Sequence, residues 1–177
     1  MIALILDNET TDLIDNHLVA LDKQPEIIEF AAVLVDLDTG EQSRQFSQLI
    51  KPMRPVPQKI TGITGLTDAD LATAPSFRAV SSVIEDLITN APMIIAHNAS
   101  FDQEMIDLEF ERLGRSLKWP MILCTVEQTV HLKGFRLSQS ALHEHLFNEP
   151  IKEAHRAAAD VQSLTRCVLE LRKRGEI

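Results

Sequence analysis

The first fifty residues carry a hydrophobic pattern that predicts three β-strands. Residues 2–6 are all apolar, which is typical of a buried strand. Residues 27–36 form a longer apolar run, and the turn-forming residues 38–40 separate it from a third strand over 41–50. Successive strands joined by a tight turn pair antiparallel, so an antiparallel meander is expected over residues 1–50.

Beyond residue 65, helical spacing alternates with short apolar runs. Between Ser76 and Ile88 the apolar side chains recur every three or four residues, as on one face of an amphipathic helix. Residues 93–96 and 121–125 each predict a short buried strand. Further helices are expected from about residue 98 to Gly114, up to about Leu132, over 137–147 and from Ala157 onward.

This order of elements predicts an α/β fold with a mixed central sheet flanked by helices. The first three strands are expected to be antiparallel, whereas the later strands, which alternate with helices, are expected to be parallel. No internal repeat, low-complexity tract or linker is visible in the sequence. A single domain is therefore expected over residues 1–177.

Two carboxylates, Asp7 and Glu9, directly follow the first apolar run. Side chains two positions apart on a strand point to the same face, so both acids project together if the strand continues through Glu9. Carboxylates forced together repel one another, and a divalent metal ion removes that conflict. Asn8, which lies between them, is expected to point away from the metal site.

Two further acids are placed where they could reach the same point. Asp102 follows the predicted strand over 93–96, at the carboxyl end where ligands bind in open α/β sheets. Asp160 lies beside the apolar stripe of the last helix, which is not a typical place for a solvated charge. Because oxygen ligands select hard cations, these acids favour Mg²⁺ or Mn²⁺ over zinc.

His155 is the candidate general base of this site. It lies five residues before Asp160, a separation that would turn the two side chains about 140° apart within one helix. Both can face one site only if His155 lies in the loop before the helix or in its frayed first turn. An imidazole near neutral pKa can take a proton from water, so a hydrolysis at phosphorus assisted by two metal ions is indicated.

Three segments carry a family resemblance: 7–11 (Asp-Asn-Glu-Thr-Thr), 97–102 (His-Asn-Ala-Ser-Phe-Asp) and 155–160 (His-Arg-Ala-Ala-Ala-Asp). They resemble the motifs of the histidine subgroup of the DEDD superfamily of 3′→5′ exonucleases, which includes the epsilon proofreading subunit of bacterial DNA polymerase III, exonuclease X and ribonuclease T. The resemblance implies an RNase H-like fold, two divalent metal ions on the four acids and the histidine as general base. It also implies stepwise release of nucleoside 5′-monophosphates from the 3′ end of nucleic acid, with DNA favoured.

The substrate-binding residues are less closely defined. Segment 60–64 resembles a helical Gly-Ile element that packs against the terminal nucleotide in the family, although its isoleucines could simply anchor a short helix. Asp12 stands where the family often has glycine, so the turn that meets the 3′ end could differ. Phe101 could stack on a base or belong to the core, and Asn98 could be structural. The candidate substrate contacts are Thr10, Leu13, Ile60, Ile63, Asn98 and Phe101.

Composition and charge narrow the class of protein. The chain is 45% hydrophobic and 24% charged, as in ordinary globular proteins, and no stretch approaches the length of a membrane span. Its two cysteines form no zinc spacing and no disulfide framework, so a reducing, cytoplasmic location is expected. The net charge of −9 argues against a large non-specific polyanion-binding surface, but not against a nuclease whose acids hold cations. His131, His143 and His145 show no ligand pattern and are expected at the surface.

Two other functions compete with the exonuclease. Asp7 could be the nucleophile of an aspartyl-phosphate phosphatase, but that class normally has a second Asp where this chain has Glu9, and it would begin with a parallel sheet. A non-catalytic nucleic-acid-binding module of the same fold is the other alternative, and the intact acids and His155 count against it. The expected partner is a nucleic acid 3′ end, and a polymerase partner or a homodimer stays open.

Overall fold

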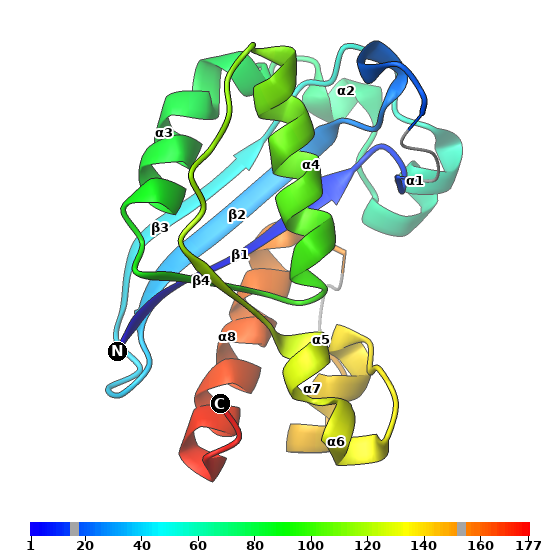
Figure 1. Cartoon of the computed structure of the whole chain (residues 1–177). Helices are drawn as coiled ribbons and strands as arrows, with labels where there is room; N and C mark the ends of the chain where they lie inside the picture. Colours follow the sequence, from blue (N-terminus) through cyan, green and yellow to red (C-terminus); the bar gives the residue numbers. More distant parts are fainter. Residues whose placement is uncertain (15–17, 152–154) are drawn as a thin grey trace.

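A five-stranded mixed sheet forms the centre of the molecule (Figure 1). The computed structural model describes residues 1–14, 18–151 and 155–177. The strand order is β3-β2-β1-β4-β5, in which β1 and β3 run antiparallel to β2, whereas β4 pairs parallel with β1 and β5 pairs parallel with β4. The predicted meander and the parallel remainder are both confirmed. The strands are β1 (Ile2–Thr10), β2 (Ile27–Asp36), β3 (Gln42–Leu49), β4 (Met93–Ala96) and β5 (Met121–Cys124).

The helices follow the predicted order, with differences in the shorter pieces. Residues 21–23, between the first two strands, form a short 3₁₀ helix, the 60–64 segment lies inside a helix, and the helix expected up to about Leu132 is divided into two short ones. No helix within the described ranges has the length and apolar character needed to cross a membrane. The helices are η1 (Leu21–Lys23), α1 (Gln58–Thr64), α2 (Asp68–Leu71), α3 (Phe77–Thr89), α4 (Ala99–Arg112), α5 (Thr125–Gln128), α6 (Val130–Lys133), α7 (Gln139–Phe147) and α8 (Ala157–Arg174).

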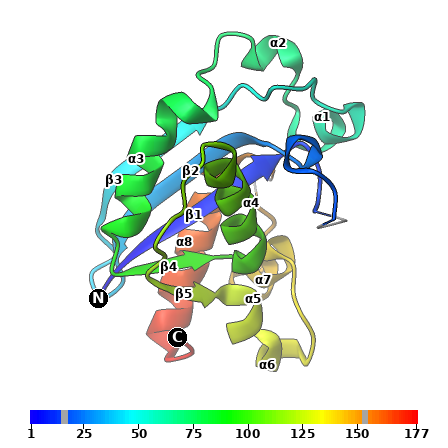
Figure 2. The same ribbon diagram turned by 45° about the horizontal axis from the view of Figure 1, so that its top comes forward.

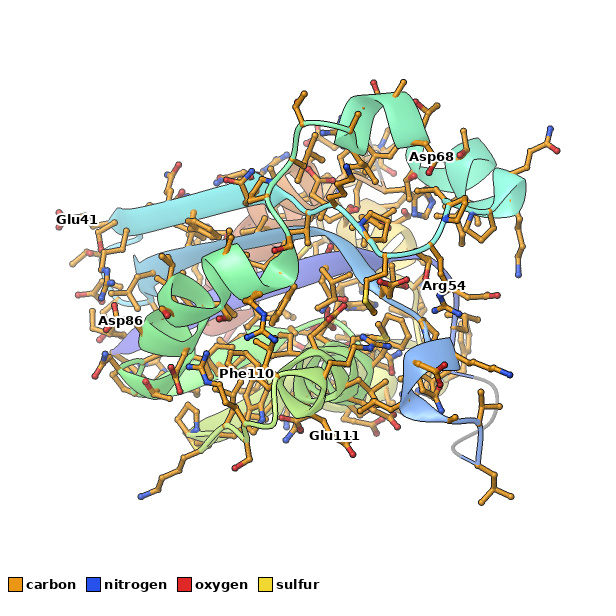
Figure 3. The ribbon with its side chains drawn as sticks, turned by 90° about the horizontal axis from the view of Figure 1, so that it is seen from above. Glu41, Arg54, Asp68, Asp86, Phe110 and Glu111 are labelled. Carbon is orange, nitrogen blue, oxygen red and sulfur yellow. The ribbon has the colours of Figure 1, made fainter. Side chains whose placement is uncertain are left out.

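Helices cover both faces of the sheet. Helices α3 and α4 lie over one face and α8 lies over the other, as Figures 1 and 2 show. Helices α3 and α4 contact each other through Phe77 and Phe110, which meet edge to face with ring centroids 5.5 Å apart. Phe110 is labelled in Figure 3. The apolar stripe of α8, which includes Val161, Leu164 and Val168, packs on the opposite face.

Alternation along β1 divides its side chains between these two layers. Leu4 and Leu6 pack in the core beneath α3 and α4, whereas Ala3 and Ile5 pack in the core beneath α8. Because side chains alternate along a strand, the residues that continue the second series lie on the α8 face. Consecutive polar residues at the carboxyl end of β1 therefore face different layers of the fold.

Candidate active site

The carboxyl end of β1 carries Asp7 and Glu9 on the same face, because β1 continues as a regular strand through Thr10. Both side chains are partly buried. The parallel neighbour β4 ends at the same edge of the sheet and leads directly into α4. Polar groups from separate segments therefore meet at this edge, the usual position of ligand sites in open α/β sheets.

Asp102 reaches this edge from the first turn of α4 and is 3% exposed. Its Oδ1 accepts two hydrogen bonds from Asn8, one from the side-chain Nδ2 at 2.9 Å and one from the backbone N–H at 3.2 Å. Asn8 therefore hydrogen-bonds a candidate ligand, a contact that the sequence pattern did not predict. Asn8 does lie on the face opposite Asp7 and Glu9, but α4 covers that face and brings a candidate ligand to it.

Asp160 reaches the site from the first turn of α8. Its Oδ2 accepts a hydrogen bond from the backbone N–H of His155 at 2.8 Å. His155 precedes the helix by two residues and adopts a left-handed backbone conformation, with φ of 67°. The loop position expected for His155 is thus the one observed, and its exposed side chain faces the same region as the acid.

Three of these side chains are close enough to bind the same metal ion. One carboxylate oxygen of Glu9, one of Asp160 and one ring nitrogen of His155 all lie within 4.8 Å of one another. The segments that supply them are far apart in the sequence, so the fold has brought them together. Asp7 and Asp102 lie outside this group of three but interact electrostatically with Glu9.

The acids of this cluster repel one another strongly. Burial, followed by the charges of Asp102 and Glu9, raises the pKa of Asp7 well above its usual range. Burial and the charge of Asp160 raise the pKa of Glu9 to about 7. Burial also raises the pKa values of Asp102 and Asp160. A hard divalent cation would relieve this repulsion and would find oxygen ligands already gathered, so the donor set fits Mg²⁺ or Mn²⁺.

Comparison with known proteins identifies the family. A family model described as Exonuclease (RNase T) matches residues 4–167. The chain belongs to this exonuclease family. It is 32% identical over 174 residues to the DNA polymerase III subunit epsilon of Pasteurella multocida, a match that covers 95% of this chain and 67% of that protein. The Escherichia coli subunit epsilon is 30% identical over 174 residues, with 95% and 70% covered.

Solved structures agree with this assignment. A structure described as exonuclease X in complex with 5′ overhanging duplex DNA is 25% identical, has a TM-score of 0.69 and covers 98% of this chain and 93% of that chain. The nuclease domain of 3′hExo, described as a DEDDh family member bound to rAMP, has a TM-score of 0.79 at 18% identity, with 98% and 92% covered, and shows the shared fold. The chain is a 3′→5′ exonuclease with the RNase H-like fold, and exonucleases of the DEDD type generally depend on divalent metals.

The predicted substrate contacts differ in their accessibility. Leu13 is 60% exposed and Ile63 is 46% exposed, so both side chains are free to meet a nucleotide. Ile60 is only 8% exposed and packs with Ile28, which favours the anchoring interpretation. Phe101 is partly buried and packs against the core beneath α4, in agreement with the core interpretation.

The polar residues near the predicted substrate site form hydrogen bonds within the chain. Thr10 is buried, and its hydroxyl donates to the backbone oxygen of Asp12 at 2.8 Å. The Asp12 side chain in turn accepts the backbone N–H of Leu13 at 2.9 Å, and no positive φ occurs at this position, so the turn does not require glycine. Asn98 is exposed, adopts φ of 67° and accepts a hydrogen bond from Arg136 at 3.2 Å.

Two other histidines, His97 and His143, bond to groups outside this cluster. Both ring nitrogens of His97 have protein partners, with Nδ1 2.9 Å from the Thr125 hydroxyl and Nε2 3.1 Å from the Leu137 carbonyl oxygen. The surface position expected for His143 is wrong, since this residue is 2% exposed. Its ring fills the α7–α8 contact, where Nδ1 meets the Glu149 carbonyl oxygen at 2.9 Å and Nε2 lies 3.2 Å from Arg166.

The sequence pattern missed three polar residues around the acids. Glu29 is buried opposite Glu9 on β2, and Arg156 forms an ion pair with it. Gln139, at the start of α7, donates to the backbone oxygen of Asp160 at 2.8 Å. A charged residue inside the apolar run of β2 was the visible signal for Glu29, but nothing local in the sequence points to its partner.

Proposed function

We propose that this chain shortens nucleic acid from the 3′ end one nucleotide at a time, with DNA favoured, using divalent metal ions. Asp7, Glu9, Asp102 and Asp160 would hold two such ions, and His155 would be the general base. The observation that carries this proposal is the approach of Glu9, His155 and Asp160 within 4.8 Å, with two further acids, Asp7 of β1 and Asp102 of α4, that interact electrostatically with Glu9. A carboxylate cluster without a base would favour simple cation binding over hydrolysis.

The residues divide the chemistry between them. The four acids would hold and orient the cations. Bound cations would polarise the scissile phosphate and stabilise the departing 3′ oxygen. His155 takes the proton from the attacking water at a ring nitrogen and so acts as the general base. The exposed position of the histidine in its loop lets it approach a terminal phosphate that enters from solvent. Attack at the terminal linkage releases a nucleoside 5′-monophosphate.

The surrounding surface supports a terminal nucleotide as the substrate. Leu13 and Ile63 are exposed hydrophobic side chains on the segments that follow β1 and form α1. Aliphatic side chains have no hydrogen-bonding groups with which to read base edges, so these residues would contact the last nucleotide without choosing its base. The 3′ end of a single strand, or of a frayed duplex, is therefore the proposed ligand.

We also propose the extent of the domain, its location and its type of partner. The chain spans about two thirds of the length of the epsilon relatives it matches, and those relatives are named as subunits of DNA polymerase III. We therefore propose residues 1–177 as one exonuclease domain that acts in the cytoplasm, with a polymerase as a possible type of partner. Pull-down of a polymerase subunit by the purified chain would test whether a polymerase is a partner.

Digestion of end-labelled oligonucleotides tests the activity itself. A DNA strand and an RNA strand of the same sequence, each labelled at the 5′ end, are incubated with the chain and Mg²⁺ or Mn²⁺. The expected product is a ladder that shortens from the 3′ end and disappears with excess EDTA or with a 3′-phosphate block, and the DNA strand is expected to react faster. The double variant Asp7→Asn, Glu9→Gln, purified in parallel, controls for contaminating nucleases. Internal cleavage, or activity that survives EDTA, would contradict the proposal.

A further inference from the structure

Glu29 is a buried acid for which the proposed chemistry has no use. Its side chain is 3% exposed, and it lies directly opposite Glu9 in the antiparallel ladder of β1 and β2. Directly opposed side chains of such a ladder share one face of the sheet, so Glu29 lies on the α8 face. Like charges directly opposite each other destabilise the sheet. A carboxylate kept there needs compensation from a specific partner.

Arg156 and the first turn of α8 provide that compensation. Nε of Arg156 donates to Oε2 of Glu29 at 3.0 Å, and Nη2 donates to Oε1 at 3.2 Å, which is a two-pronged arginine–carboxylate pair. The backbone N–H of Ala157 donates to Oε2 at 3.2 Å. Since Ala157 is the first residue of α8, the carboxylate also lies at the positive end of that helix.

These contacts hold the residues that immediately follow the candidate base. His155 precedes Arg156 and has the left-handed backbone conformation that most residues avoid, with φ of 67°. Its own backbone N–H is held by Asp160 from the α8 side. Residues 155–157 are thus fixed from two directions, by Asp160 of the helix and by Glu29 of the sheet.

We propose that Glu29, through Arg156 and Ala157, is a positioning residue that sets the location of the His155 imidazole relative to the metal-binding acids. This inference rests on the proposed function, since it assigns the geometry of the same base. Both oxygens of Glu29 are bonded to Arg156 and Ala157, so the proposal assigns Glu29 a role through these residues and no direct contact with substrate or cation. Its loss should displace the base and leave the cation-binding acids in place.

Substitution of Glu29 by glutamine tests the proposal. Glu29→Gln keeps the size of the side chain and removes the charge that binds Arg156. We expect kcat to fall about 10- to 100-fold, as displacement of a catalytic group by about 1 Å does, while KM and the affinity for Mn²⁺ stay within about threefold of the parent. The backbone amide NMR signals of His155 and Ala157 should shift or broaden in the same variant without any substrate present.

Variants of Arg156 provide a second test, in which the substituted side chain is not itself buried. Its side chain is 44% exposed, so Arg156→Gln leaves no cavity in the core, and thermal melting checks that the variant is folded at the assay temperature although Glu29 has lost its charged partner. We expect Arg156→Gln to lower kcat to the level of Glu29→Gln, and Arg156→Lys to recover part of it, because lysine restores the charge but not the two-pronged geometry. The double variant Glu29→Gln, Arg156→Gln should be no slower than either single variant.

A closely matched ion pair elsewhere provides the control. Glu26, just before β2, is also a buried acid that pairs with a half-exposed arginine, Arg54, at 3.1 Å, and it also accepts a backbone N–H, that of Met53 at 2.6 Å. Its side chain is 4% exposed and that of Arg54 43%, compared with 3% and 44% for Glu29 and Arg156. Arg54 lies against the segment before β2 (Figure 3), where it also donates to the Lys23 carbonyl. Glu26→Gln should therefore cost similar stability but leave kcat within about threefold of the parent.

The outcomes separate this inference from the proposed function. An inactive parent chain would overturn the exonuclease proposal together with any role of Glu29 in turnover. An active parent whose Glu29→Gln variant has unchanged kcat would overturn the positioning role alone. So would a parallel loss of Mn²⁺ affinity, which would show that Glu29 acts on the cations, or an equal loss of kcat in Glu26→Gln, which would show a general effect of destabilisation.

Discussion

The backbone N–H of His155 donates to Oδ2 of Asp160 across 2.8 Å, so one acid both faces the cation site and fixes the loop that carries the candidate base. The two residues are five positions apart, and this bond is possible because His155 has left the helix. Asp160 therefore has a charge-dependent role and a hydrogen-bonding role. These two roles can be separated by substitution.

Asp160→Asn should keep the hydrogen bond and lose the charge. The asparagine oxygen can still accept the His155 N–H, so thermal stability should stay close to that of the parent. Turnover should fall by about 100-fold or more, the usual cost of removing one charged group from such a site. Asp160→Ala loses the hydrogen bond as well, and its free energy of unfolding should fall by about a further 1 kcal/mol. Parental kcat in Asp160→Asn would show that its charge is dispensable.

His155 and Asp7 should respond differently to alanine substitution. Asp7→Ala should abolish both tight Mn²⁺ binding and turnover, since Asp7 lies among the repelling carboxylates. His155→Ala should lower turnover by about 100- to 10,000-fold, the usual contribution of a general base, while calorimetric titration with Mn²⁺ stays nearly normal. Equal loss of Mn²⁺ binding in both variants would instead make His155 a ligand, which its distance from Glu9 and Asp160 permits.

The sequence predicted those parts of the site that depend on local periodicity. Strand alternation put Asp7 and Glu9 on one face, and the spacing of His155 from Asp160 required the histidine to precede the helix, as it does. The antiparallel start and the parallel remainder of the sheet followed from the succession of strands and helices. These inferences succeeded because each depends on geometry within a few consecutive residues.

The parts that the sequence did not predict depend on which elements pack together. Alternation placed Asn8 on the other face of β1 but could not show that α4 brings Asp102 there, 94 residues along the chain. The partners Glu29 and Arg156 are 127 residues apart. His143 was expected at the surface because its partners, which lie on α8 and in the loop after α7, are fixed only by the tertiary fold.

The α3 helix allows its packing to be tested with two neighbouring residues. Ile84 is fully buried between α3 and the sheet, whereas Val83 is 45% exposed. Ile84→Ala should lower the free energy of unfolding by about 3 kcal/mol, because it removes buried methyl groups and leaves a cavity. Val83→Ala should change it by no more than about 0.5 kcal/mol. Urea denaturation of both variants measures the difference, and equal effects would contradict the orientation assigned to α3.

Stability should depend on pH through His97. Burial lowers the pKa of His97 to about 4, from an ordinary value of 6.5, and outweighs the hydrogen bond with the Leu137 carbonyl, which acts in the opposite direction. The unfolded chain therefore binds a proton at this residue before the folded chain does, so the stabilisation is fully present above about pH 6.5 and is lost as the pH falls toward 4. The lost contribution should be about 2 kcal/mol. Urea denaturation at pH 7 and pH 4.5 should show a smaller decrease for His97→Gln than for the parent, whereas the exposed His131→Gln should behave as the parent does. If all three chains lose the same stability, the buried ring of His97 does not control this dependence.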